Sequence, residues 1–273
     1  MSATRFEPKW GARTYLMGIL NVSPDSFSGD GVVSPERALD MTTGMVEQGA
    51  DIIDIGGEST RPGSDPIARE EELRRVVPAV ELLVDRLGIP LSVDTYKIEV
   101  AQAALERGVT VLNDIWGLKK EPRLADMAAR YDAHLILMSN QRDVSPQHDV
   151  EFPDIVDTVR QDLIRATSLA LERGVPQNRI IIDPGIGFGK TQPQNLELLR
   201  RLDEIRALGF PMLVGTSRKS VLGHVLNLPA DDRLEATAAT VALGIAQGAD
   251  VVRVHDVREM SRVCRIADAI VRG

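Results

Sequence analysis

Short apolar runs alternate with longer helical patterns along the whole of this chain, and this alternation constrains its fold most. Eight runs rich in aliphatic and β-branched residues are interpreted as strands: Tyr15–Leu20, Asp51–Ile55, Pro90–Val93, Thr110–Leu112, His134–Met138, Arg179–Ile182, Pro211–Val214 and Asp250–Val254. Apolar residues recur at helical spacing after the runs, for example in Pro35–Gln48, Arg69–Arg86, Lys97–Arg107 and Pro193–Leu208. Strict alternation of strands and helices predicts a parallel sheet covered by helices.

Eight strand–helix units are the number that closes a parallel sheet into a barrel. The 273 residues suit this architecture, which typically needs about 250. We therefore predict an α/β fold, a single (β/α)8 TIM barrel, as one domain over residues 1–273 with its core at about 15–271. A doubly wound open sheet is the alternative that the same alternation allows. Ser34 is expected to cap the helix that starts at Pro35.

Composition narrows the classes of function. The net charge is −8 and no run of Lys and Arg is present, which argues against a nucleic-acid partner. No apolar stretch approaches the ~20 residues of a membrane span, so no membrane partner is expected. The one cysteine, Cys264, cannot form an intrachain disulfide, which favours the reducing cytoplasm, and it is expected to be a buried apolar residue.

Polar and charged residues follow nearly every predicted strand. In a barrel the active site is built at the carboxyl ends of the strands, so these residues are the candidates. They include Asn21, Thr60, Arg61, Asp94, Asn113, Asp183, Lys219, Ser220, Arg253 and His255. A lone Asp, Asn, Thr or Ser here is commonly a helix N-cap, but Lys219, Arg253 and His255 are not caps. Their convergence therefore predicts a binding site.

The residue types have a chemical logic. Asp94, Asn113 and Asp183 offer hydrogen-bond acceptors, and such a trio suits a flat heterocycle with a donor-rich edge, such as the 2-amino pyrimidinone of a pterin. Asn21, Arg253 and His255 supply a cation and polar groups for a phosphorylated leaving group. A third set could hold further anions, and it consists of Arg61, Lys219 and Ser220.

Seven blocks of sequence together resemble the motifs of the dihydropteroate synthase family, in the family's order. They are Asn21-Val22-Ser23-Pro24-Asp25-Ser26-Phe27, Gly56-Gly57-Glu58-Ser59-Thr60-Arg61-Pro62-Gly63, Ser92-Val93-Asp94-Thr95-Tyr96-Lys97, Asn113-Asp114, Asp183-Pro184-Gly185-Ile186-Gly187-Phe188, Gly215-Thr216-Ser217-Arg218-Lys219-Ser220 and Arg253-Val254-His255. The match runs from about residue 15 to the C-terminus. The resemblance implies condensation of 6-hydroxymethyl-7,8-dihydropterin pyrophosphate with p-aminobenzoate to give dihydropteroate and pyrophosphate. It also implies a TIM barrel, a Mg²⁺ cofactor, a homodimer and inhibition by sulfonamides.

The resemblance also assigns roles to single positions. Asn21 looks like the magnesium ligand. The expected contacts to the pterin pyrophosphate are Thr60, Asp94, Asn113, Asp183, Lys219, Arg253 and His255, and the catalytic group within them is Asp94, Lys219, Arg253 and His255. Met138 and Phe188 should pack near the pterin ring, although ordinary barrel core remains open for Met138. The expected p-aminobenzoate contacts are Phe27, Arg61, Pro62 and Ser220.

The chain departs from the family pattern at three places. Ser139, followed by Asn140-Gln141-Arg142, stands where the family often has histidine. The first loop reads Ser28-Gly29-Asp30, and position 221 is valine where phenylalanine is expected. These departures bear on loop details and inhibitor fit.

Other interpretations carry less weight. Gly185–Thr191 looks like a nucleotide-binding loop, but three residues instead of four precede its Gly-Lys pair. A methyltetrahydrofolate:corrinoid methyltransferase shares the pterin-binding barrel but needs no pyrophosphate site. A catalytically silent pterin-binding paralogue would be expected to have lost residues that are present here. Glu70-Glu71-Glu72 is expected to be a solvated run near a helix start.

Overall fold

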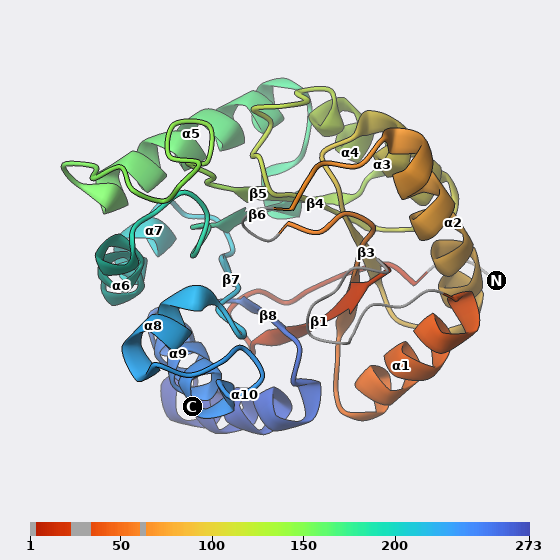
Figure 1. Cartoon of the computed structure of the whole chain (residues 1–273). Helices are drawn as coiled ribbons and strands as arrows, with labels where there is room; N and C mark the ends of the chain where they lie inside the picture. The colour runs from red at the N-terminus through yellow and green to blue at the C-terminus, as the bar shows by residue number, and fades with distance from the viewer. Residues whose placement is uncertain (1–3, 23–33, 61–63) are drawn as a thin grey trace.

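The computed structural model describes residues 4–22, 34–60 and 64–273, and within them the chain forms a (β/α)8 barrel (Figure 1). Its strands are β1 Tyr15–Asn21, β2 Ile52–Gly56, β3 Leu91–Asp94, β4 Val111–Asp114, β5 His134–Met138, β6 Ile180–Asp183, β7 Leu213–Val214 and β8 Val251–Val254. The helices lie around them as an outer ring. The predicted TIM barrel is therefore confirmed, and the doubly wound open sheet is wrong.

The strands pair in parallel in the order β6-β5-β4-β3-β2-β1-β8-β7. The pairing of β1 with β8 shows that the sheet curls back on itself. Between β6 and β7 the contact is one bridge, from Ile182 to Met212. The barrel is therefore closed by less strand pairing between β6 and β7 than between its other neighbouring strands.

The helices of the described chain are α1 Pro35–Glu47, α2 Arg69–Arg86, α3 Ile98–Glu106, α4 Leu124–Tyr131, α5 Ile155–Glu172, α6 Gln192–Arg200, α7 Leu202–Arg206, α8 Ser220–Leu226, α9 Leu234–Ala246 and α10 Val257–Val271, with a short 3-10 helix at Gln177–Arg179. The Ser34 side chain accepts a hydrogen bond from the Arg37 amide, which confirms it as the N-cap of α1. The single helix predicted over Pro193–Leu208 is wrong, because the backbone at Arg201 leaves the helical region and separates α6 from α7.

Aliphatic side chains fill the space between the strands and the helices. Cys264 is buried in this core, as expected. The aromatic residues near the N-terminus lie together at the amino end of the barrel. Phe6 packs edge-to-face against Trp10, Tyr15 and His134. Burial lowers the pKa of His134 to about 3, so this ring is a neutral core residue.

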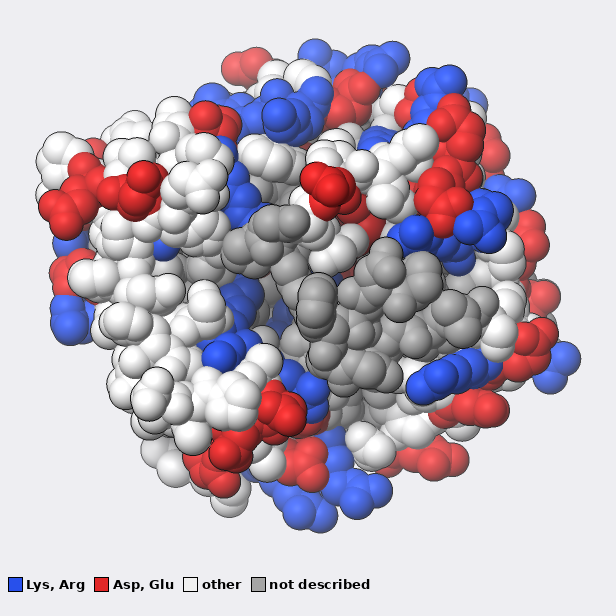
Figure 2. All heavy atoms as spheres, viewed as in Figure 1, with Lys and Arg blue, Asp and Glu red and all other residues white. Residues whose placement is uncertain are grey.

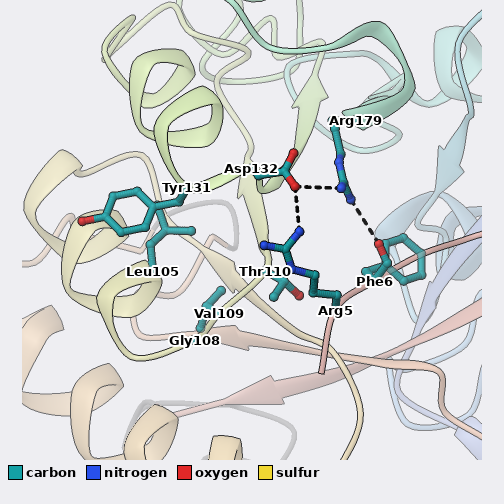
Figure 3. A pocket seen from close by; sticks show the side chains of 9 residues that line it. All are labelled: Arg5, Phe6, Leu105, Gly108, Val109, Thr110, Tyr131, Asp132 and Arg179. Carbon is teal, nitrogen blue, oxygen red and sulfur yellow. Dashed lines mark hydrogen bonds and ion pairs between the residues drawn. The ribbon is translucent and has the colours of Figure 1, made fainter. Parts of the chain in front are cut away.

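A pocket of about 190 Å³ lies near this aromatic group, at the amino ends of β4 to β6 (Figure 3). Arg5 and Arg179 both donate to Asp132 beside it, at 2.8 and 2.9 Å. The pocket is thus at the end of the barrel opposite the carboxyl ends of the strands. None of the described helices is long and apolar enough to cross a membrane.

Candidate functional site

The carboxyl ends of four neighbouring strands bring polar groups into one row. Strand register pairs Asn21 with Gly56, Gly56 with Asp94, and Asp94 with Asn113. A side chain built on Gly56 would lie 3.9 Å from the Asn21 Oδ1 and 4.0 Å from the Asp94 Oδ2, so these two oxygens flank the glycine. Because register follows from parallel pairing, residues far apart in sequence meet at the mouth of the barrel.

One arginine from β8 joins two carboxylates at this mouth. Arg253 Nε donates to Asp54 Oδ2 at 2.6 Å, and its NH2 group donates to Asp94 Oδ2 at 3.0 Å. Asn113 Nδ2 donates to the same Asp54 oxygen at 3.0 Å. Asp54 is fully buried, and its Oδ1 has no partner among the described residues. A single cation thus serves two buried carboxylates.

This arrangement shifts the titration of Asp94. Burial raises its pKa, the charge of Arg253 opposes the rise, and the nearby charge of Asp54 adds to it. Two carboxylates that share one guanidinium cannot both be fully neutralised by it. The proton affinity of Asp94 is therefore sensitive to any further charge that enters the site.

Asp183 and Lys219 form a second charged pair of the site, from β6 and the segment after β7. Burial raises the pKa of Asp183 and lowers that of Lys219 to about 8, and each group's charge opposes the other's shift. Asp183 Oδ1 accepts a hydrogen bond from the Gly185 amide at 2.7 Å, which fixes the carboxylate. Lys219 Nζ donates to the Ile186 carbonyl and lies 4.7 Å from the centre of the Phe188 ring.

The loops after β5 and β6 are bound together by a buried lysine. Lys190 is fully buried, and its Nζ donates to the carbonyls of Gly185, Ser139 and Phe188 at 2.8, 3.1 and 3.1 Å. Gly185 has φ +70°, and a Cβ there would lie 2.0 Å from the Ser139 oxygen. Burial lowers the pKa of Lys190 to about 7. Its three N–H groups match three inward carbonyls, so its ammonium holds the shape of the Asp183–Phe188 segment.

A small apolar cluster separate from the main core lies beside these charges. It contains Met138, Phe188 and Ile115, each at most 8% exposed, with Trp116 packed against it. Met138 is also the register partner of Asp183. The sequence predicted that Met138 and Phe188 pack near a pterin ring. It gave no prediction for Ile115 and Trp116, whose position directly after Asn113-Asp114 was the available signal.

The segment after β2 is anchored by Glu58. Lys97 Nζ and the Tyr96 hydroxyl donate to its two oxygens at 2.7 and 3.0 Å, and the Ile67 amide donates to it at 3.0 Å. Lys97 Nζ also reaches Glu72 at 2.5 Å, and Glu72 is 1% exposed. The prediction of a solvated glutamate run is therefore wrong for Glu72, because Lys97 compensates its charge inside the protein.

The segment after β7 is held by Arg233. Its guanidinium donates to the carbonyls of Arg218, Lys219 and Leu228. Gly223 makes room for it, since a Cβ there would lie 2.0 Å from the guanidinium. Ser220, the first residue of α8, is exposed nearby.

His255 follows β8 and faces the segment after β7. Its Nδ1 lies 3.0 Å from the Ser217 hydroxyl, which also accepts from the His255 amide.

The structure thus brings the described candidates to one end of the barrel, and Figure 2 shows basic side chains lining a hollow left of the centre of that face. Phe27, Arg61 and Pro62 lie outside the described residues. Asp54 and Lys190 were missed. Asp54 had a signal, because a carboxylate inside an apolar strand needs a partner. Across the described parts of the chain, no group of three or more His, Cys, Asp or Glu side chains could hold a metal ion.

Comparison with known proteins gives one answer. The model of the pterin binding enzyme family matches residues 17–255. The chain is 48% identical to the dihydropteroate synthase of Clostridium beijerinckii over 264 residues, which cover 96% of each chain. It is also similar to the solved dihydropteroate synthase of Clostridium difficile in the presence of pteroic acid, with TM-score 0.92, 48% identity, and 98% and 100% of the two chains covered. The enzyme of Xanthomonas albilineans with 4-aminobenzoic acid matches with TM-score 0.87 and 37% identity over 94% and 93% of the two chains.

Proposed function

The chain belongs to the dihydropteroate synthase family of pterin-binding enzymes, and from this membership we propose how its strand-end residues divide the reaction between them. The reaction of the family is the transfer of a dihydropterin methylene group from pyrophosphate to the amine of p-aminobenzoate. The observation that carries the proposal is the row of Asp94, Asn113 and their neighbours at the mouth of the barrel. We also propose that residues 1–273 form one barrel domain.

The pterin ring is assigned to the acceptors Asp94, Asn113 and Asp183. All three are at most 7% exposed, so a hydrogen bond to them is formed away from bulk water. The donor-rich edge of a 2-amino pyrimidinone can donate hydrogen bonds to the carboxylate oxygens of this site. Met138 and Phe188 supply apolar surface beside them, which suits the faces of a flat ring.

Asp183→Asn should weaken pterin binding by at least about tenfold. The change preserves size but turns an anionic acceptor toward the pterin into a mixed donor and acceptor, and a charged hydrogen bond is worth roughly 1.5–3 kcal/mol. Calorimetric titration with a dihydropterin measures the effect. An unchanged dissociation constant would remove Asp183 from the site.

The pyrophosphate group is assigned to the side of the site formed by β8, β1 and the segments after β2 and β7. Arg253, His255 and Lys219 provide the positive and polar groups there, and Thr60 lies at the end of the described part of the second loop. A guanidinium matches phosphate oxygens with two parallel hydrogen bonds. An anion bound there would compete with the Asp54 and Asp94 carboxylates for hydrogen bonds from the Arg253 guanidinium.

Asn21 is the residue that would hold a magnesium ion. Its amide oxygen lies near Gly56 in the strand-end row, and amide and phosphate oxygens are ligands that Mg²⁺ prefers. One protein ligand is enough in principle, because Mg²⁺ usually keeps several waters and binds substrate phosphates. When bound, the ion would act as a Lewis acid on the pyrophosphate oxygens.

The protein's own groups act mainly through position and charge. The bond between the pterin methylene carbon and pyrophosphate breaks as positive charge spreads into the dihydropterin ring, and Asp94 is placed to stabilise that charge. Arg253 and His255 stabilise the departing pyrophosphate. The amine of p-aminobenzoate then forms the new C–N bond and loses its proton to pyrophosphate or water. No nucleophile from the protein is needed.

The p-aminobenzoate is assigned to the outer part of the site, beside Phe188, Lys219 and Ser220, together with Phe27, Arg61 and Pro62. We expect p-aminobenzoate to bind poorly to the free enzyme and well when pyrophosphate and Mg²⁺ are present. The reason is that Phe27, Arg61 and Pro62 follow closely after Asn21 and Thr60 in the sequence, the residues assigned to Mg²⁺ and pyrophosphate.

Titration of p-aminobenzoate with and without pyrophosphate and Mg²⁺ tests this order. By linkage, p-aminobenzoate should tighten pyrophosphate binding by the same factor. Equal affinities in the two titrations would contradict ordered binding.

A homodimer is proposed through the outer faces of α9 and α10. Leu243, Ile266 and Ile270 are 62%, 66% and 77% exposed on these two helices, which pack against each other. Exposed apolar side chains that gather on neighbouring helices favour burial against a partner. Ile266→Asp combined with Ile270→Asp should convert a dimer to a monomer in sedimentation analysis. Ile164→Asp on α5 is the matched control, and a monomeric wild type would contradict the proposal.

The test of the proposed activity is direct. Purified protein incubated with 6-hydroxymethyl-7,8-dihydropterin pyrophosphate, p-aminobenzoate and Mg²⁺ should form dihydropteroate and pyrophosphate, which chromatography separates. Asp94→Asn is the paired variant, because it keeps the shape of the site and removes the charge. Absence of product from the wild type would overturn the proposed function.

A further inference from the structure

Arg142 is a partly buried cation that the assignments above leave unused. It stands four residues past Met138, the last residue of β5, in the segment that departs from the family pattern. No acidic side chain pairs with it in the described part of the chain, and burial lowers its pKa to about 10. A cation kept in such a place without an acid needs another reason to be there.

The backbone of Arg142 is fixed before its side chain begins. Its amide donates to Asn140 Oδ1 at 3.0 Å, and Asn140 is fully buried with its Nδ2 on the Ile115 carbonyl at 2.9 Å. On the other side is Gly189 with φ +69°, where a Cβ would lie 2.4 Å from the Arg142 nitrogen. The backbone of Arg142 is therefore packed between its own loop and the loop that contains Gly189, and this packing restricts where its side chain can point.

The side chain then joins two parts of the site. The guanidinium lies 4.4 Å from the centre of the Phe188 ring, and its NH1 group donates to the Thr60 carbonyl at 2.7 Å. Phe188 belongs to the segment after β6, and Thr60 to the segment after β2, 82 residues earlier in the sequence than Arg142. A planar guanidinium can stack on a ring and donate in its own plane at once, which a lysine ammonium cannot do.

The neighbours of Arg142 indicate which substrate it serves. Arg142 follows Met138, the register partner of Asp183, by four residues, so it belongs to the segment after β5 and not to the strand ends. Lys219 is close enough for its pKa to be lowered in part by Arg142, and it faces the same Phe188 ring at 4.7 Å. Two cations over one aromatic ring favour an aromatic ligand that carries a negative charge.

We propose that Arg142 is a positioning residue for p-aminobenzoate, which it serves by holding Thr60 and Phe188 in one wall of the outer site. The inference rests on the proposed function and deepens it. Among the described residues Arg142 contacts none of the pterin acceptors Asp94, Asn113 and Asp183, so it can affect the pterin only through the Phe188 ring.

Three variants test the assignment. Arg142→Met should raise the KM for p-aminobenzoate about tenfold or more, the range expected from losing a charge-assisted hydrogen bond. The calorimetric affinity for a dihydropterin and the urea unfolding midpoint should stay near wild type. Arg142→Lys keeps the charge and should recover only part of the p-aminobenzoate affinity. Arg123→Met, on a surface arginine paired with Glu121, is the control.

The outcomes separate cleanly. No product from the wild type would defeat the proposed function itself. Product from the wild type with an equal p-aminobenzoate KM in Arg142→Met would overturn only the role of Arg142. Equal loss of pterin and p-aminobenzoate affinity would also overturn it, because that result describes a general structural residue. Full recovery in Arg142→Lys would show that charge alone matters and would contradict the stacked geometry.

Discussion

Arg253→Met is expected to lower both the stability and the activity of the protein more than most single changes. The substitution leaves the Asp54 and Asp94 carboxylates buried without their guanidinium, and removing one partner of a buried ion pair typically costs about 3–5 kcal/mol. Thermal unfolding should move down by roughly 10 °C, given a shift of about 2–4 °C per kcal/mol for a chain near this size. Binding of the pterin pyrophosphate should fall further than binding of a pterin without pyrophosphate.

The pH dependence of this loss has a definite sign. Burial and the neighbouring Asp54 raise the pKa of Asp94 to about 8 even with Arg253 present, and loss of the Arg253 charge raises that pKa further. A carboxyl group with a raised pKa in the folded state contributes stability at low pH and loses it as pH rises through that pKa. The stability gap between wild type and Arg253→Met should therefore widen as pH rises above about 8, where the folded wild type has lost the Asp94 proton and the folded variant still holds it. A gap independent of pH would contradict the carboxylate explanation.

Two companion variants show whether Arg253 acts through its carboxylates. Arg253→Met together with Asp54→Asn should be less destabilised than the sum of the two single changes, because one uncompensated charge is gone. Arg253→Lys keeps a positive charge and should retain part of the stability. Equal loss of affinity for pterins with and without pyrophosphate would make Arg253 a structural residue only.

Lys190→Met is expected to have the second large effect. The side chain is fully buried, and its removal leaves the Ser139 carbonyl without its donor, while the carbonyls of Gly185 and Phe188 each lose one of two hydrogen bonds. An unsatisfied buried acceptor costs about 1–3 kcal/mol, and the two further hydrogen bonds that are lost add to this cost. The Asp183–Phe188 segment should therefore change shape, or the protein should unfold more easily. We expect a lower urea midpoint and a pterin affinity reduced at least tenfold.

A surface lysine gives the control for Lys190. Lys120→Met removes an ammonium that lies over the Trp116 ring and should leave both the urea midpoint and the pterin affinity near wild type. Lys190→Gln, which can still donate two hydrogen bonds, should fall between wild type and Lys190→Met. If all the Lys190 variants match the wild type, the three carbonyls do not depend on this ammonium.

Much of the candidate site could be predicted because each parallel strand is recognisable in the sequence as a short apolar run that polar residues follow. A residue that ends an apolar run must lie at the mouth of the barrel, and register then places Asn21, Asp94 and Asn113 side by side. Asp183 follows from the same rule. Asp54 was harder, because it lies two residues before the end of its strand, where apolar neighbours hide it.

Other features could not be read from side-chain patterns. Lys190 is held by backbone carbonyls, which carry no sequence signature, and its place in a glycine-rich run directed attention to nucleotide loops. The break between α6 and α7 follows the backbone at Arg201, while the apolar spacing continues across it. The burial of Glu72 depends on Lys97, 25 residues away. Long-range partners of this kind are set by the fold.

The central claim is that the strand-end row holds the pterin ring and that the outer wall at Phe188 holds the aryl group. A crystal structure of this protein with pteroic acid, which contains both halves, tests it most directly. We predict electron density for the pterin within hydrogen-bonding distance of Asp94, Asn113 and Asp183, with the aryl group between Phe188 and Lys219. Density for the pterin at the pocket near Arg5 and Arg179, or with the two halves exchanged, would contradict the account.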